Sequence, residues 1–93
     1  MDPELRTKIE KAAQVLIARG AREVYVFGSA ATGRLREGSD VDLAVVGLPP
    51  AVFYRAMGKA AEALERELDL IDLDGENAFT RYLREEGELQ RVA

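Results

Sequence analysis

Two aspartates spaced two residues apart are the first residues in this chain whose types and spacing could do chemistry. Asp40 and Asp42, the acidic pair, open an apolar run that continues to Val46. Residues i and i+2 of a strand face the same side, so the two carboxylates would project together, about 6.5–7 Å apart along the backbone. Two converging carboxylates are costly to hold close unless a cation lies between them. The acidic pair therefore predicts a site for a divalent metal such as Mg²⁺, which prefers carboxylates together with phosphate oxygens.

A glycine and a serine upstream of the acidic pair could bind phosphate. Gly28 and Ser29, the Gly-Ser corner, directly follow an apolar run that ends at Phe27. A glycine in this position can adopt backbone conformations closed to other residues, which lets the chain approach a ligand closely. Ser29 would offer its hydroxyl and backbone N–H to an anion. Gly33 would allow a second close approach, and Ser39 adds a hydroxyl beside the acidic pair.

Each of these features has a simpler structural explanation when it is taken alone. A Gly-Ser pair after a strand is usually a turn, an Asp-x-Asp at a strand start is often a solvated strand entrance, and Ser39 could be a turn hydroxyl. The combined spacing Gly-Ser-x10-Asp-x-Asp should arise by chance in a chain of this length at roughly one in a thousand. The combination therefore favours one site that holds phosphate and metal together.

Composition narrows the chemistry that such a site can use. The 93 residues contain no histidine and no cysteine, which excludes imidazole and thiolate zinc sites, histidine general bases and disulfides. A net charge of −4 argues against a nucleic-acid surface, which normally shows clustered Lys and Arg. We find no apolar run near the ~20 residues of a membrane helix and no signal peptide, so we expect a cytoplasmic protein without membrane contact.

Hydrophobic spacing predicts three strands that alternate with four helices. The long helix between the second and third strands predicts that these strands are parallel, with a right-handed crossover, whereas the first two strands could be antiparallel neighbours. The last helix would bury Phe79, Tyr82 and Leu83, and residues 88–93 are left unassigned. The fold class is therefore α/β (α+β), with a small mixed sheet of three to four strands and about four flanking helices. The predicted elements are a helix after Asp2 that closes at Gly20, a strand at 23–27, a short helix within 28–36, a strand at 40–46, a helix at 51–67, a strand at 68–73 and a helix at 77–86.

The Gly-Ser corner, Gly33 and the run Ser39-Asp40-Val41-Asp42-Leu43 together resemble the signature of the DNA polymerase beta-like nucleotidyltransferase superfamily. The short length and the flanking elements resemble its minimal nucleotidyltransferase (MNT) branch. This resemblance covers nearly the whole chain, and it implies one minimal nucleotidyltransferase domain over residues 1–93.

The family also implies a third acidic residue on the strand after the long helix. Asp69 and Asp72 are the two candidates, and they would lie on opposite faces of that strand. The family pattern of apolar-Asp-apolar-apolar matches Leu68-Asp69-Leu70-Ile71, so Asp69 is preferred. Its apolar neighbours in sequence suggest a buried carboxylate, which would need a metal or another cation nearby.

What the resemblance implies about activity can now be stated in full. It implies a transferase that moves a nucleoside monophosphate, AMP from ATP, to a hydroxyl and releases pyrophosphate. Two Mg²⁺ ions would be held by catalytic carboxylates, and the glycines and serines would bind the nucleotide. The carboxylates are Asp40, Asp42 and Asp69, and the nucleotide-binding residues are Gly28, Ser29, Gly33 and Ser39.

The acceptor and the partner are implied by the family alone. Its members commonly act on a HEPN-domain protein encoded by a neighbouring gene, and several serve as antitoxins that attach AMP to a HEPN toxin. Homo- or hetero-oligomer formation is left open.

One departure from the family pattern motivates a different class of function. Many minimal nucleotidyltransferases carry an arginine between the serine and the second glycine, where this chain has Ala30, Ala31 and Thr32. Arg34 and Arg36 follow and could reach a triphosphate or could simply be solvated. The alternative is a non-catalytic binding module that neutralises or scaffolds a HEPN-type partner.

Overall fold

The first helix begins where the sequence places a capping aspartate. The computed structural model describes residues 2–36, 38–87 and 89–93. The side chain of Asp2 accepts a hydrogen bond from the backbone N–H of Leu5 at 3.3 Å, and Pro3 occupies the first helical position, where its missing N–H costs nothing. Helix α1 (Pro3–Ala18) buries the small and aliphatic residues spaced along one side and is followed by Gly20 at φ +120°. The predicted cap and end of this helix are confirmed.

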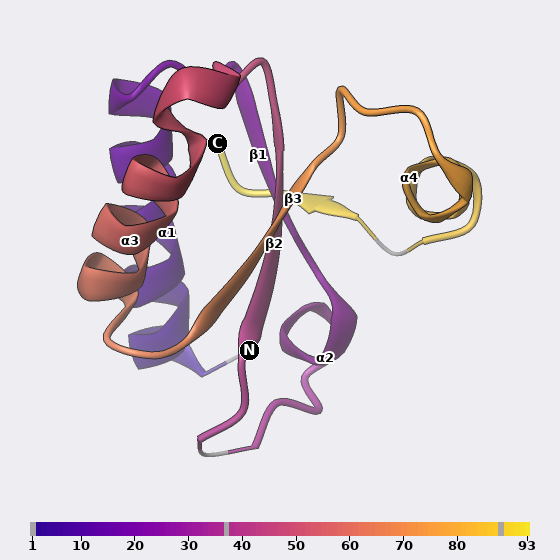
Figure 1. Ribbon diagram of the computed structural model, residues 1–93. Coiled ribbons are helices and arrows are strands. Elements are labelled where there is room, and N and C mark those ends of the chain that lie inside the picture. Colours follow the sequence, from indigo (N-terminus) through magenta and orange to yellow (C-terminus); the bar gives the residue numbers. More distant parts are fainter. Residues whose placement is uncertain (1, 37, 88) are drawn as a thin grey trace.

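Four strands form one mixed sheet in the order β3-β2-β1-β4 (Figure 1). Strand β1 pairs antiparallel with β2 and with β4, whereas β2 pairs parallel with β3, as the long intervening helix required. The predicted fold class and the relative directions of the first three strands are confirmed. The strands are β1 (Glu23–Phe27), β2 (Val41–Val46), β3 (Leu68–Asp72) and β4 (Gln90–Arg91).

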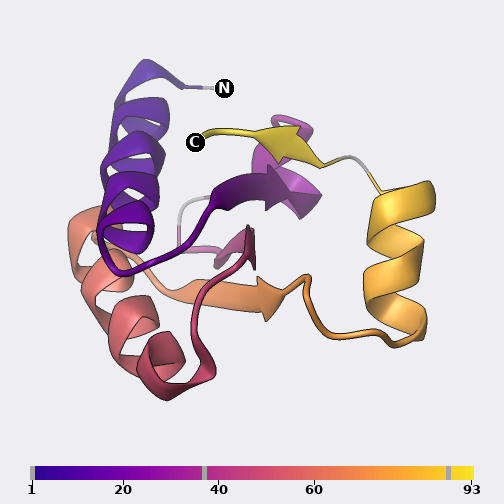
Figure 2. The same cartoon turned by 90° about the horizontal axis from the view of Figure 1, so that it is seen from above.

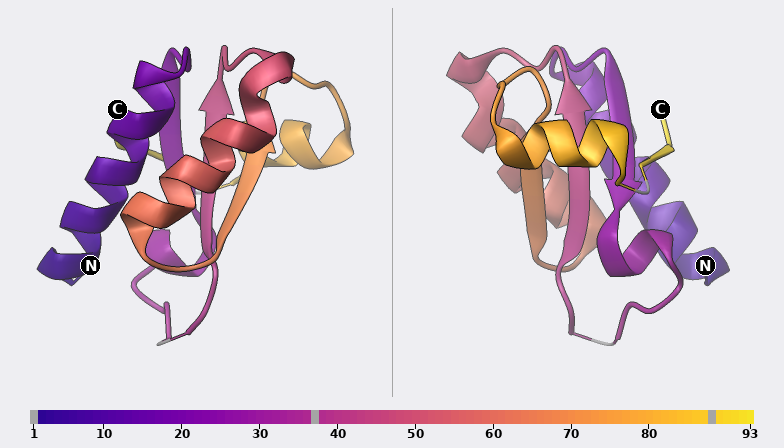
Figure 3. Two further views of the ribbon diagram at one scale, coloured as in Figure 1. Left: turned by 60° about the vertical axis from the view of Figure 1, so that its left-hand side comes forward. Right: turned by 90° about the vertical axis from the view of Figure 1, so that its right-hand side faces the viewer.

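Helices α1 and α3 cover one face of the sheet, and α2 and α4 lie on the other (Figures 1 and 2). The face under α1 and α3 holds the main core, where strand residues such as Val26, Leu43 and Val45 are fully buried. A second, smaller core lies under α4 and includes Phe27 and Leu83. Figure 3 shows α4 crossing the open face of the strands, apart from α2. The remaining helices are α2 (Gly28–Ala31), a 3₁₀ turn η1 (Pro50–Val52), α3 (Phe53–Leu64) and α4 (Ala78–Glu85).

Several predicted boundaries were wrong. Helix α2 starts at Gly28 itself, directly after β1, rather than after a turn. The predicted helix at 51–67 divides into η1 and α3 and ends early, because Glu65 adopts a left-handed conformation at φ 60°. Strand β4 falls in the tail that the sequence left unassigned.

Within the described residues, no helix has the length and apolar character needed to cross a membrane.

The face that α4 presents to the sheet also differs from the prediction. Leu83 is buried as expected, but Phe79 is 48% exposed and Tyr82 is 53% exposed. Thr80 is the second buried residue of the helix, at 3% exposure. Helix α4 therefore buries a polar residue beside Leu83, and its two aromatic side chains stay about half exposed.

Thr80 is held by hydrogen bonds at the start of α4. Its hydroxyl donates to the carbonyl of Gly75 at 2.7 Å and accepts from the backbone N–H of Asn77 at 3.1 Å. The Asn77 side chain in turn accepts from the backbone N–H of Thr80 at 2.9 Å, which completes a capping box. Arg84 adds a bond from its guanidinium to the carbonyl of Leu73. These bonds fix α4 relative to the end of β3.

Replacing Thr80 by valine tests this anchor. Thr80→Val keeps the volume but leaves the Gly75 carbonyl and the Asn77 N–H without their partner, so we expect a loss of about 1–3 kcal/mol in the free energy of unfolding. Urea denaturation measures this loss. Thr7→Val, at an exposed site on α1, is the matched control and should change stability by less than about 0.5 kcal/mol. Equal stabilities for the two variants would contradict the anchor.

Candidate functional site

The strand register brings two of the three predicted carboxylates together. Asp42 on β2 is paired with Asp69 on β3 in the parallel register, and with Phe27 on β1 in the antiparallel register. Directly paired residues of neighbouring strands share a face, so both carboxylates lie on the face that carries α2 and α4. Asp40 precedes β2 and is exposed. Asp69 is also exposed, so the expectation of a buried third carboxylate was wrong.

The alternative third carboxylate, Asp72, lies elsewhere. It pairs with Val45, whose side chain belongs to the core under α1 and α3. One of its carboxylate oxygens accepts a hydrogen bond from the backbone N–H of Asp74 at 2.9 Å, which stabilises the turn after β3. Asp72 therefore serves a turn at the far end of the strand, away from Asp42.

The carboxyl of Asp42 is destabilised in its charged form. Burial is the largest cause that raises the pKa of Asp42 above its ordinary value of 3.8, followed by the negative charges of Asp69 and then Asp40. The charges of Asp69 and Asp40 therefore disfavour the ionised form of Asp42. These three carboxylates, Asp40, Asp42 and Asp69, are called the acidic patch below. Such a donor set fits a divalent cation, because a cation would remove the repulsion that raises this pKa.

The carboxylates are not gathered into a ready-made metal site. Within residues 2–36, 38–87 and 89–93, no group of three or more Asp, Glu, His or Cys side chains is arranged so that it could hold a metal ion. The register places Asp42 and Asp69 opposite each other, while Asp40 acts on Asp42 through its charge.

Gly28 lies directly against Asp42. Its φ is +70°, a left-handed conformation that favours glycine, and a Cβ at this position would overlap the Oδ2 atom of Asp42. The Gly-Ser corner is thus adjacent to the acidic patch because only a glycine lets the end of β1 pass so close to this carboxylate. Gly33 also has a positive φ of +75°, but a Cβ there would meet open space. Gly33 is required for the turn and makes no close approach.

Ser39 belongs to a turn that an arginine ties to the segment between α3 and β3. Its backbone N–H donates to the carbonyl of Arg36 at 3.0 Å, and its own carbonyl accepts from the guanidinium of Arg66 at 3.3 Å. The backbone N–H of Val41 then donates to the carbonyl of Glu67 at 3.1 Å. Arg66 therefore helps position the segment that carries Asp40. Sequence reasoning missed this role, because backbone carbonyl partners about 30 residues away leave no local pattern.

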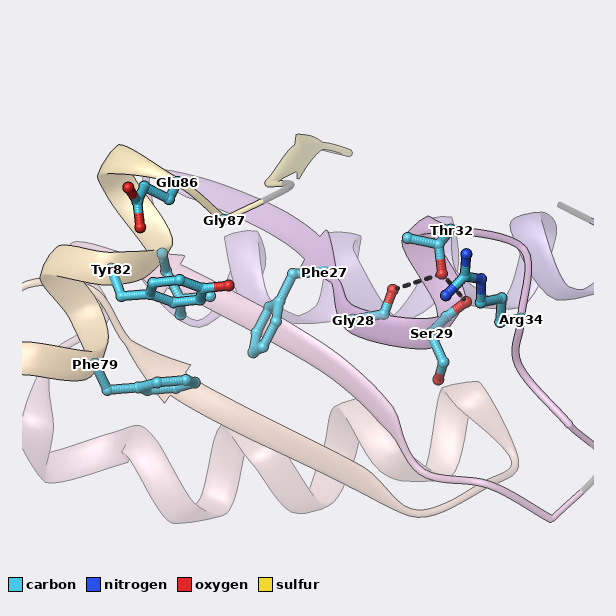
Figure 4. Close-up of a pocket in the computed structure, with 10 residues that line it drawn as sticks. Phe27, Gly28, Ser29, Thr32, Arg34, Phe79, Tyr82, Glu86 and Gly87 are labelled. Atoms are coloured by element: carbon cyan, nitrogen blue, oxygen red, sulfur yellow. Dashed lines mark hydrogen bonds between the residues drawn. The ribbon is translucent and has the colours of Figure 1, made fainter.

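A pocket of about 460 Å³ opens between α2 and α4, beside the acidic patch (Figure 4). Ser29, Thr32 and Arg34 line it on the α2 side. Phe79, Tyr82 and Glu86 line it on the α4 side, and Phe27 lies between the two. Gly28 also lines the pocket, but Gly33 and Ser39 do not. Of the four predicted nucleotide-binding residues, the structure therefore brings Gly28 and Ser29 to this pocket.

The raised pKa of Asp42 predicts how stability depends on pH. The folded state holds the Asp42 proton more tightly than the unfolded state, so stability falls as pH rises from about 3.8 through the folded pKa. Asp42→Asn removes this cost. We expect the variant to be more stable than the parent at pH 7 in EDTA, and the difference to shrink as the pH falls toward 3.8. Thermal melts over this pH range measure the effect, and a variant less stable at pH 7 would contradict it.

Two alanine substitutions test the close approach at Gly28. Gly28→Ala and Gly33→Ala both force a left-handed alanine, which costs about 1–2 kcal/mol. Only Gly28→Ala also drives a methyl group into Asp42, so we expect it to lower the free energy of unfolding by a clearly larger amount. Parallel denaturation of the two variants isolates the overlap, and equal losses would show that the contact with Asp42 is easily relieved.

Comparison with solved structures shows which folds are similar. A structure described as a candidate minimal nucleotidyltransferase is 29% identical, with a TM-score of 0.75 over 94% of each chain. A toxin-antitoxin structure with AMP-PNP is 23% identical, with a TM-score of 0.73 over 95% of this chain and 72% of the other. A complex of a tri-AMPylated Shewanella oneidensis HEPN toxin with its MNT antitoxin contains a chain 20% identical, with a TM-score of 0.69 over 96% of this chain and 71% of the other. These matches establish a shared fold.

Comparison of the sequence itself with protein families identifies a family for this chain. A search of curated protein sequences found no significant match. The sequence profile described as polymerase beta, nucleotidyltransferase matches residues 4–89, which includes the Gly-Ser corner, the acidic pair and Asp69. With this match and the observed fold, the chain belongs to the polymerase beta nucleotidyltransferase family.

Proposed function

We propose that this chain is a single minimal nucleotidyltransferase domain that transfers AMP from ATP to a hydroxyl on a partner protein. The observation that carries the proposal is the shared patch at the end of β1. There Asp42 is paired with Asp69 of the neighbouring strand, and Gly28 lies close against the Asp42 carboxylate. Membership of a nucleotidyltransferase family supports the same chemistry.

Asp40, Asp42 and Asp69 would hold two Mg²⁺ ions in this function. Bound Mg²⁺ supplies positive charge that offsets the charge of the phosphates. After burial, the negative charges of Asp69 and Asp40 are the next causes of the raised pKa of Asp42, and bound Mg²⁺ would offset this repulsion, which supports the assignment. Ser29 would donate its hydroxyl to the β- or γ-phosphate, and Gly28 keeps that end of the chain close enough to the carboxylates. Gly33 and Ser39 would act through the loop that joins α2 to Asp40.

The reaction is a displacement at the α-phosphorus of ATP. The acceptor hydroxyl forms a new oxygen–phosphorus bond, the bond to the β-phosphate oxygen breaks, and pyrophosphate leaves with the bonding electrons. The hydroxyl proton passes to a carboxylate oxygen of Asp69, which lies on the acidic patch and is exposed to an incoming acceptor. The chain contributes position and charge, as in phosphoryl transfer generally.

The acceptor we propose is a HEPN-type protein encoded next to this chain, with the chain acting as its antitoxin in the cytoplasm. Support comes from the similar folds found in toxin-antitoxin structures, one of which contains an AMPylated HEPN toxin.

A non-catalytic binding module is the second candidate. Two observations favour it: the family arginine is replaced within Ala30, Ala31 and Thr32, and the described carboxylates form no ready-made metal site. In this function the chain would neutralise its partner by contact alone.

Labelled transfer separates the two candidates. The chain is incubated with α-labelled ATP, Mg²⁺ and the neighbouring gene product, and the label on the partner is followed over time. We expect transfer by the parent chain and a loss of roughly 10²-fold or more in Asp69→Asn, because a group that acts at the reacting atoms is removed.

Asp72→Asn is the matched control, since it lies on the same strand but faces away and keeps its oxygen acceptor for Asp74. It should transfer at the parent rate. Absence of label with an active control enzyme would refute the transferase. Neutralisation of the partner without label would establish the binding module.

A further inference from the structure

Two exposed aromatic side chains on α4 are not explained by the core. Phe79 and Tyr82 are 48% and 53% exposed, although they are the largest apolar side chains of the helix. The helix instead buries Thr80 and Leu83. Since burying an aromatic side chain is worth a few kcal/mol, a helix selected only for stability would turn these rings inward. Their exposure on one side of the helix points to a ligand.

Both rings lie in the pocket that contains the Gly-Ser corner. Figure 4 shows Phe79 and Tyr82 projecting from α4 toward Phe27, with Gly28 and Ser29 beyond it. Phe79 meets Phe27 edge to face, with ring centroids 6.3 Å apart. The volume of about 460 Å³ lies within the range of small-molecule sites, which are lined by aromatic side chains and a few polar groups.

The two ends of this pocket differ in chemistry, and the difference orients a ligand. The α2 end carries the hydroxyls of Ser29 and Thr32 and the cation of Arg34, which suit phosphates. The α4 end carries the rings of Phe79 and Tyr82 and the carboxylate of Glu86. A negative charge at the α4 end would repel phosphate, whereas a flat, uncharged heterocycle can stack there.

We propose that the α4 end of the pocket binds the base of the nucleotide, with Tyr82 and Phe79 as the stacking surface. This proposal rests on the proposed function for the placement of the phosphates at the α2 end. Base and phosphates would then span one continuous pocket past Phe27.

The rings are held in place before a ligand arrives. Thr80 and Arg84 bond α4 to the Gly75 and Leu73 carbonyls at the end of β3, and Leu83 packs into the smaller core. A fixed stacking surface binds more tightly than a mobile one, because less conformational entropy is lost on binding.

The test compares a ligand with a base to one without it. Binding of Mg²⁺-ATP and of Mg²⁺-tripolyphosphate is measured by calorimetry for the parent chain and for Tyr82→Leu, which keeps apolar bulk and removes the ring. We expect the dissociation constant for ATP to rise roughly fivefold to a hundredfold, the effect of losing one stacking partner, while that for tripolyphosphate stays unchanged.

Two further variants test whether the effect needs the aromatic ring at position 82 and whether it follows from the loss of any exposed aromatic ring. Tyr82→Phe keeps the ring and should bind ATP like the parent. Tyr54→Leu removes a ring that is 78% exposed on α3, on the other face of the sheet, and should also have no effect. Melting temperatures verify that each variant is folded.

The outcomes distinguish this inference from the proposed function. If Tyr82→Leu binds ATP like the parent, or loses ATP and tripolyphosphate equally, the base does not stack on α4 and the inference is overturned while nucleotide binding stands. If neither phosphate ligand binds the parent chain, the proposed function fails. Adenosine alone then decides the inference: a shift of the Tyr82 ring resonances on titration supports the base site, and no shift overturns it.

Discussion

The pairing of β2 on both sides is the constraint on which the site depends. Asp42 lies beside Asp69 and Gly28 only because β2 pairs antiparallel with β1 and parallel with β3 in one register. A slip of one residue would turn Asp42 into the main core and bring Leu43 to the open face. Leu43 and Val45 are fully buried under α1 and α3, so the hydrophobic effect holds the register. The same burial that stabilises the sheet therefore positions the carboxylate.

The site is assembled from features that lower the stability of the isolated chain. Asp42 carries a raised pKa beside two other acids, and two aromatic rings on α4 are about half exposed. A purely structural element would gain no stability from either feature. They occur together on the face of the sheet with the smaller core, while the other face carries most of the buried residues. Stability and chemistry are thus divided between the two faces.

The sequence predicted the elements held by local patterns and missed those held by distant contacts. The strand 23–27, the cap at Asp2 and the preference for Asp69 over Asp72 as the neighbour of the acidic pair follow from periodicity, capping chemistry and the family pattern, and the structure agrees with their placement. The predicted buried face of α4 was wrong. Phe79, Tyr82 and Leu83 lie on one side of the helix at i, i+3 and i+4 spacing, and periodicity does not say which edge of that side is buried.

In the structure the side of α4 that carries Thr80 is buried, and the Thr80 hydroxyl donates to the Gly75 carbonyl. Strand β4 was missed for a different reason, because two residues are too few to show a strand alternation. The pocket could not be predicted because it forms between α2 and α4, which are far apart in sequence. The catalytic and binding roles of the site residues remain predictions.

The missing family arginine can be understood from the positions that replace it. Ala30 is fully buried and Ala31 packs against the main core, so neither could carry an arginine without disturbing α2. Only Thr32 is exposed, and its hydroxyl bonds to the carbonyls of Gly28 and Ser29 while lining the pocket. The departure from the family therefore amounts to one side chain. Arg34 lines the same pocket two residues later, so a cation is still present at the end where the phosphates would bind, although it comes from the loop rather than from the helix.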